Sequence, residues 1–247
     1  YTNSLVQATG QNFVHRADDG TYYSNIDSPE IERAEQMLYD LTKNGCTYHE
    51  GNNYWAMRND VYGGGMKEGL CLFYICETSF FTDTVEEISA VWGDITNGEL
   101  MFAPLPRDDS GDGNYYLLTQ VSGYMICEGA SNPEGAALLA TCERFKIIDP
   151  TVIDIDRNQL KQKYLWTEEM LEMYDTCKEI AQANPRAIVT GDMTDNLNSI
   201  ISTFQYGPCR SDNPSTWAQV KEQNRDALDY YLEELNTMMA ELAESGT

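Results

Sequence analysis

The stretch that decides the fold lies near the end of the chain, from Asn213 to Asn236, and reads NPSTWAQVKEQNRDALDYYLEELN. Its opening residues are typical of a helix start and predict one helix over about 214–243. The apolar residues recur at helical spacing as a single stripe: Trp217, Val220, Leu228, Leu232, Leu235, Met239 and Leu242. Packing against its own domain explains a single stripe, so this helix predicts a helical layer at the C-terminal end of the fold.

A second helix is predicted near the front of the chain. Ser28 can cap its first turn, Pro29 suits the first helical position, and Asn44-Gly45 supplies a left-handed exit. Apolar residues at Ile31, Ala34, Leu38 and Leu41 give it one buried face.

Two further helix starts carry capping signals. Ser131 and Glu134 form a capping-box pattern, and an apolar face follows it at Ala136, Ala137, Leu139, Ala140 and Phe145. Thr167 can cap a helix over about 167–182, where Trp166 is placed to pack on Leu171. Another helix is expected over about 194–205.

Short apolar runs predict strands between the first helices. Leu70–Cys76 is too short for a typical helix and predicts a strand buried on both faces, and Leu100–Ala103 and Leu117–Cys127 predict two more. Thr21-Tyr22-Tyr23 is expected to be a short extended stretch. Strands alternating with helices, followed by helices alone, predict the α/β class with a helical C-terminal layer.

The composition narrows the classes of partner. The 247 residues include 40 acidic and 16 basic ones, a formal net charge of −24, and such a field repels phosphate backbones and anionic lipid surfaces. We therefore expect no nucleic-acid partner. No apolar run approaches the roughly 18 residues that span a bilayer. Because Tyr1 follows neither an initiator methionine nor a signal segment, we expect a processed terminus or a fragment of a larger protein.

The cysteines and histidines offer little metal chemistry. The seven cysteines include no CxxC pair and only His15 and His49 could supplement them, which argues against zinc. The odd number of cysteines at scattered positions favours buried thiols over a disulfide framework, with one or two bridges left open.

Several segments, taken in order, resemble the extracellular solute-binding proteins of bacterial sugar ABC importers, family 1. They are Asn12–Leu41, Met66–Phe73, Met101–Pro106, Tyr115–Cys127, Ser131–Phe145 and the helix from Pro214. The entry into the Leu70–Cys76 run departs from the family pattern, because Lys67 precedes Gly69 and Met66 stands in place of an aromatic residue.

The resemblance implies the type II periplasmic-binding-protein fold, represented mainly by the second lobe. Residues 1–100 and 151–247 would form that lobe, and 101–150 would belong to the first lobe, the rest of which has no counterpart here. It further implies a binder without cofactor, metal or catalytic residues. The protein would capture a neutral oligosaccharide or similar solute outside the membrane and deliver it to an ABC permease, with the full-length protein lipid-anchored at the extracellular face.

The candidate ligand residues come from two sources. By the resemblance, Glu77, Thr78, Ser79, Phe80 and Phe81 fall at the ligand-facing end of a strand. Sugars also stack on aromatic rings while acids and amides take their hydroxyls, which suits Trp55, Trp92, Phe80, Phe81, Tyr115 and Tyr116 beside Glu77, Asn114 and Gln120. For each aromatic residue taken singly, packing in the core is the competing interpretation.

Rival classes remain open. Asp108–Gly113 resembles the first half of a calcium loop, but the twelfth position is Thr119, which favours a solvated turn. Gly63-Gly64-Gly65 indicates a hinge or surface turn rather than a phosphate-binding loop. A glycoside hydrolase could use a pair of the many carboxylates, although the chain contains no GxSxG or HExxH motif. A protein-interaction module that uses the long C-terminal helix is the third class.

Overall fold

The computed structural model describes residues 2–47, 69, 72–75, 81–82, 85–98, 100–118, 125–186, 194–210 and 213–245. The described part is a mixed, helix-rich fold with two small two-stranded sheets. Its elements, in chain order, are α1 (Thr2–Ala8), β1 (Val14–Arg16), β2 (Tyr22–Ser24), α2 (Pro29–Lys43), α4 (Val85–Trp92), β3 (Leu117–Leu118), α5 (Pro133–Ile148), α6 (Pro150–Tyr164), α7 (Glu168–Ala183), β4 (Pro185–Arg186), α8 (Asp195–Tyr206) and α9 (Trp217–Ser245).

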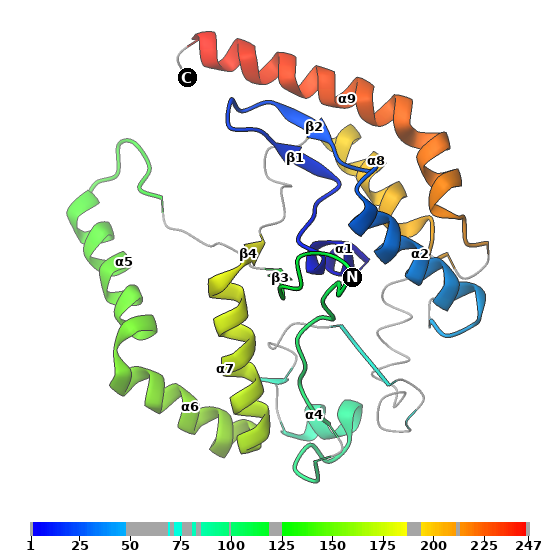
Figure 1. Ribbon diagram of the computed structural model, residues 1–247. Helices are drawn as coiled ribbons and strands as arrows, with labels where there is room; N and C mark the ends of the chain where they lie inside the picture. Colours follow the sequence, from blue (N-terminus) through cyan, green and yellow to red (C-terminus); the bar gives the residue numbers. More distant parts are fainter. Residues whose placement is uncertain are drawn as a thin grey trace.

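The first hydrophobic core joins the two ends of the chain. It lies between α1, the β1–β2 hairpin, α2, α8 and α9, and Figure 1 shows the blue N-terminal elements beside the orange C-terminal ones. Trp217 stands at its centre, where its ring lies 6.0 Å from that of Phe13 and 5.7 Å from that of Phe204. The apolar stripe predicted on the long helix is therefore confirmed from Trp217 to Leu235.

A side chain of α9 binds the backbone of the hairpin directly. Asn236 Oδ1 accepts from the Tyr22 N–H at 2.7 Å, and Asn236 Nδ2 donates to the Tyr22 carbonyl at 2.8 Å. The amide thus pairs with β2 as a neighbouring strand would. In the antiparallel hairpin, His15 lies opposite Tyr23.

The second hydrophobic core lies under α4, α6 and α7. Phe81, Trp92, Phe102 and Trp166 form a chain of ring contacts, with centroids 4.7 to 5.0 Å apart. Trp166 also donates its indole N–H to the Phe81 carbonyl at 2.9 Å. Trp166 and Leu171 both lie in this core, as the sequence predicted.

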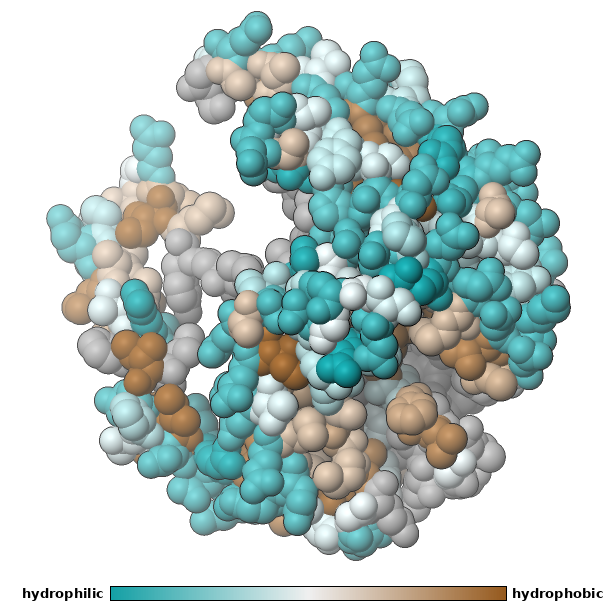
Figure 2. Space-filling view, in the orientation of Figure 1, coloured by the Kyte–Doolittle hydropathy of each residue, from teal (hydrophilic) through white to brown (hydrophobic). Residues whose placement is uncertain are grey.

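Helix α5 and the start of α6 form an arm that stands away from the rest of the fold, whereas the end of α6 packs beside α7 (Figure 1). Figure 2 shows hydrophobic residues exposed along this arm, and they include Leu138, Leu139, Ile148, Ile153 and Ile155. The predicted apolar face of α5 is thus exposed at Leu139 instead of buried.

The strand predictions were mostly wrong. Within the predicted run Leu70–Cys76, residues 72–75 form no strand, and Leu72 and Phe73 are each 86% exposed. Leu100–Ala103 is irregular: Phe102 packs against the second core, and none of the described strands pairs with this run. Of the predicted run Leu117–Cys127, the structure describes residues 117–118, which form a strand paired in parallel with Pro185–Arg186, and residues 125–127, which form none.

The helix predictions were largely right, with two exceptions. The helices expected over 167–182, 194–205 and 214–243 correspond to α7, α8 and α9. The capping box at Ser131 is wrong, because Asn132 Oδ1 accepts from the Gly135 N–H at 2.9 Å and caps the helix instead. The sequence reading also missed α6, which Asp149 caps by accepting from the Thr151 N–H at 2.8 Å.

The described cysteines are all unpaired, but most of them are not buried. Cys209 lies in the interior as expected, whereas Cys46, Cys127 and Cys142 are exposed. No helix in the described ranges is both long enough and apolar enough to cross a membrane.

Candidate functional site

The best-built cluster of polar and aromatic side chains surrounds Tyr116, just before β3. One side of its ring faces Gly10 at the end of α1, and the guanidinium of Arg186 on β4 lies over the ring with its carbon 4.6 Å from the centroid. Gly10 has a φ of +83°, and a Cβ placed there would come within 2.6 Å of the ring. A glycine is therefore required for this close approach.

The Tyr116 hydroxyl is held by the turn that precedes it. It donates to Asp112 Oδ2, while Asp112 Oδ1 accepts from the Asn114 N–H at 2.9 Å. The hydrogen bond from Tyr116, followed by that from Asn114, holds the pKa of Asp112 below its usual value. Asp112 is thus an ionised acceptor that fixes the ring.

Tyr115 lies on the same segment with its ring exposed. The guanidinium of Arg107 is 5.2 Å from the ring centroid, and Asn184 Nδ2 donates to the Tyr115 carbonyl at 3.1 Å. Arg107 is itself paired with Asp109 at 2.7 Å. The segment therefore presents two tyrosine rings, each beside a guanidinium.

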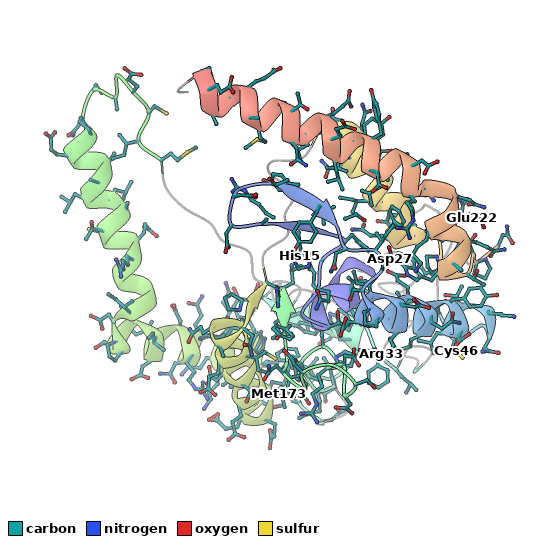
Figure 3. All side chains as sticks on the ribbon, turned by 45° about the horizontal axis from the view of Figure 1, so that its top comes forward. His15, Asp27, Arg33, Cys46, Met173 and Glu222 are labelled. Carbon is teal, nitrogen blue, oxygen red and sulfur yellow. The ribbon has the colours of Figure 1, made fainter. Side chains whose placement is uncertain are left out.

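His15 approaches this cluster from β1, at the position labelled in Figure 3. Its ring stacks on Tyr23 with 5.7 Å between centroids, and its Nε2 is buried without a hydrogen-bond partner. Burial, followed by the positive charge of Arg186, lowers the pKa of His15. The imidazole is therefore neutral at pH 7 and leaves Arg186 as the nearby cation.

We call Tyr115, Tyr116, Asp112, Arg186 and His15 the Tyr116 cluster. Aromatic faces, a carboxylate acceptor and guanidinium donors together suit a polyhydroxylated ligand that stacks and hydrogen-bonds at the same time. Its residues come from β1, the segment before β3, and β4, which lie in distant parts of the chain.

Two of the predicted ligand residues, which are adjacent in the sequence, lie on the cluster segment, and a third lies elsewhere. Tyr115 and Tyr116 share the cluster, whereas Phe81 is 3% exposed in the second core, the packing role that the sequence left open. Trp92 packs in the same core. The predicted residues Trp55, Glu77, Thr78, Ser79, Phe80 and Gln120 lie outside the described residues.

The half calcium loop is a turn held by protein contacts. Arg33 Nε donates to both carboxylate oxygens of Asp108, at 3.2 and 3.0 Å, and Asp108 Oδ1 accepts from the Ser110 N–H at 3.0 Å. Asp109 pairs with Arg107, and Asp112 binds Tyr116. Across the described residues, no group of three His, Cys, Asp or Glu side chains could hold a metal ion.

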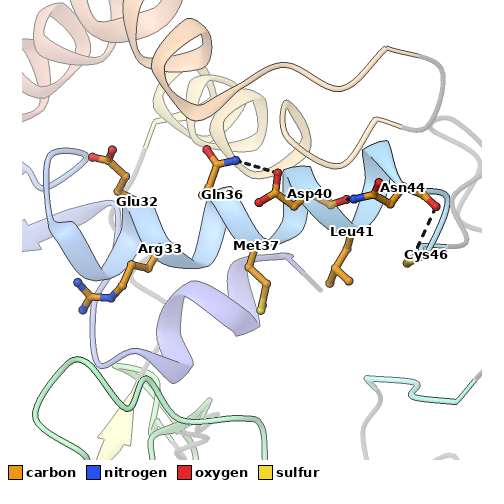
Figure 4. A pocket seen from close by; sticks show the side chains of 8 residues that line it. All are labelled: Glu32, Arg33, Gln36, Met37, Asp40, Leu41, Asn44 and Cys46. Atoms are coloured by element: carbon orange, nitrogen blue, oxygen red, sulfur yellow. Dashed lines mark hydrogen bonds between the residues drawn. The ribbon is translucent and has the colours of Figure 1, made fainter.

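Two shallow depressions lie elsewhere. One of about 610 Å³ follows the outer face of α2 past Met37 and Leu41 (Figure 4). There Gln36 binds Asp40 at 3.0 Å, so the polar groups largely satisfy one another. The other, of about 540 Å³, is the seam between β2 and α9, where Asn236 is occupied by Tyr22. Neither combines aromatic rings with overlying guanidinium groups, as the Tyr116 cluster does.

The sequence reading missed Arg186, His15 and Asp112 as members of the site. Asp112 lay in a segment examined only for calcium, and His15 was considered only as a zinc ligand. Arg186 follows Asn184-Pro185 with no motif around it, so no local signal could have identified it. Comparison with protein-family models, curated proteins and solved structures gives no match for this chain.

Proposed function

We propose that this chain is part of an extracellular solute-binding protein that captures a carbohydrate and that the sugar binds at the Tyr116 cluster. The observation that supports it is the convergence of Tyr115, Tyr116 and Asp112, on the segment before β3, with Arg186 on β4; both tyrosines were expected as sugar contacts. In this proposal the protein is a binder, not an enzyme, and needs no cofactor.

The chemistry follows from the geometry of the cluster. The exposed Tyr115 ring offers a stacking face for the C–H groups of a pyranose. Hydroxyl groups of the sugar would then accept from Arg186 and donate to the Asp112 carboxylate. Asp112 is suited to accept because its pKa is held low by its hydrogen bonds.

The remaining parts of the proposal rest on the family resemblance. The fold would be the second lobe of the type II periplasmic-binding-protein architecture, with 101–150 in the first lobe. The parent protein would be lipid-anchored at the outer face of the cell membrane and would deliver its solute to an ABC permease. The mixed, helix-rich fold with its small sheets is compatible with the α/β class in general.

Calorimetry against a panel of neutral and acidic sugars tests the proposal. We expect saturable binding that Tyr115→Ala weakens by about tenfold or more. The substitution removes the stacking ring and, with it, the contact between this ring and the Arg107 guanidinium. Tyr230→Ala is the matched control, since Tyr230 is an exposed tyrosine on α9. Binding that both variants leave unchanged would contradict the site, and release of reducing-end sugar by the purified protein would favour a hydrolase instead.

One observation favours a second candidate, a protein-interaction module. Leu138 and Leu139 on α5 are 65% and 61% exposed, on the arm that stands away from both cores. The surface suited to a protein partner is therefore α5, not the long α9 on which the sequence placed it. Concentration-dependent mass in solution that Leu138→Ser abolishes would support this candidate.

A further inference from the structure

We propose that the solute bound at the Tyr116 cluster carries a carboxylate and that Arg186 is the residue that binds it. This inference rests on the proposed function and narrows its substrate class from carbohydrates in general to acidic sugars.

The bonding state of Arg186 is the first observation. No hydrogen bond or ion pair joins its guanidinium to any residue that the structure describes; its one charge-directed contact is the face of Tyr116 at 4.6 Å. The Nε–H group is buried without an acceptor, while the terminal Nη groups are not among the buried unpartnered atoms. A guanidinium that stacks on a ring still has the N–H groups along its edge available as donors. Two of these N–H groups have the spacing needed to bind both oxygens of a carboxylate.

The charge balance of the protein is the second observation. The chain has 40 acidic residues for 16 basic ones, yet among the described arginines Arg186 alone has a buried nitrogen without an acceptor. Two arginines on nearby segments have carboxylate partners, Arg107 with Asp109 at 2.7 Å and Arg33 with Asp108 at 2.5 Å, and Arg16 donates to the Gly20 carbonyl. A carboxylate on the ligand would provide the ion-pair partner that Arg186 lacks among the described residues.

The titratable groups that face Arg186 from neighbouring elements do not serve as its ion-pair partner. Asp112, from the turn before β3, attracts it at a distance but is occupied by the Tyr116 hydroxyl and the Asn114 N–H. His15, from β1, is neutral at pH 7 because burial and Arg186 both lower its pKa. The cation therefore faces a neutral imidazole and a carboxylate with which it forms no ion pair.

Two pairs of sugars provide the direct test: galacturonate with galactose, and glucuronate with glucose, which differ only by a carboxylate in place of a hydroxymethyl group. Titrations at about 0.15 M salt screen the overall negative charge beyond about 8 Å. We expect at least one acid to bind about tenfold more tightly than its neutral partner, the effect of one charge-assisted pair. Arg186→Gln should remove this preference, because it costs more affinity for the acid than for the neutral sugar.

Controls separate charge from geometry and from folding. Arg144→Gln removes the same charge from the exposed surface of α5 and should leave the preference intact. Arg186→Lys keeps the positive charge but loses the paired donors of the guanidinium. We therefore expect it to retain only part of the preference for the acid over the neutral sugar. A urea unfolding midpoint equal to that of the wild type shows that Arg186→Gln is folded.

The outcomes distinguish the two proposals. Neutral sugars that bind as well as their acids, with or without Arg186, would overturn the carboxylate inference and leave the proposed function standing. Binding of citrate as tight as that of the uronates would support an Arg186 anion site and overturn the sugar function. No binding of any of these probes, nor of the wider panel, would overturn both.

Discussion

Glu35 is a carboxylate whose burial should make the protein less stable as the pH rises. It lies on the inner face of α2, its side chain is 0% exposed, and neither of its oxygens has a hydrogen-bond partner. Burial therefore raises its pKa well above the ordinary value of 4.5. The substitution that tests this is Glu35→Gln, which keeps the shape and removes the charge.

The size of the effect follows from linkage. A group whose pKa is raised in the folded state contributes its full stability below the unfolded pKa and loses it as the pH rises through the folded pKa. If Glu35 is still neutral at pH 7, the 2.5 units between pH 4.5 and pH 7 correspond to about 3 kcal/mol lost, at about 1.4 kcal/mol per unit. Glu35→Gln should abolish this loss.

Urea unfolding at pH 4.5 and at pH 7 measures it. Relative to wild type, Glu35→Gln should gain up to about 3 kcal/mol more stability at pH 7 than at pH 4.5. The comparison between the two pH values cancels the constant cost of burying an amide. Glu222→Gln, on the exposed side of α9 (Figure 3), is the control and should show no such difference. A Glu35→Gln effect that is equal at both pH values would refute the reasoning.

Three more predictions concern single contacts. Gly10→Ala should destabilise the fold by about 2 kcal/mol, because the positive φ is strained for alanine and the new Cβ meets Tyr116; thermal unfolding and the near-UV signal of the tyrosines will show it. Asn236→Ala should cost about 2 kcal/mol for two lost hydrogen bonds to Tyr22, measured by urea unfolding with the exposed Asn158→Ala as control. The pKa of Asp27 is lowered to about 2 by its partners Arg225 and Lys221, so its contribution to folding stability is present above about pH 4 and is lost as the pH falls toward 2. Asp27→Asn should therefore flatten the acid side of the stability profile. Equal acid unfolding midpoints for wild type and variant would count against this prediction.

Helices could be predicted from sequence wherever the deciding interactions are local. The Ser28 side chain accepts from the Ile31 N–H at 3.5 Å, and Thr167 accepts from the Met170 N–H at 3.2 Å, as their positions in the sequence indicate. The missed α6 carries the same kind of signal, since Asp149-Pro150 repeats the pattern of Ser28-Pro29. These ends are set within four residues, which a sequence pattern captures.

Strands and the site could not be predicted in the same way, because their partners lie far away in the sequence. Leu72 and Phe73 have the composition of a buried strand, yet nothing in that run specifies a neighbouring strand, and both are exposed. Tyr115 and Tyr116 were found by their chemistry. Arg186 completes the cluster only because β3 and β4 pair, a contact across nearly 70 residues that no local pattern encodes.

The amide of Asn236 has a consequence for synthesis of the chain. It closes the edge of a hairpin made 214 residues earlier. At about 5 to 20 residues per second, a ribosome needs roughly 10 to 40 s to travel that far. During this time the backbone groups of Tyr22 emerge without the partner that will cover them. The β1–β2 hairpin of a nascent chain therefore stays uncovered until α9 has been synthesised. In this interval it is open to binding by chaperones or to pairing with other nascent chains.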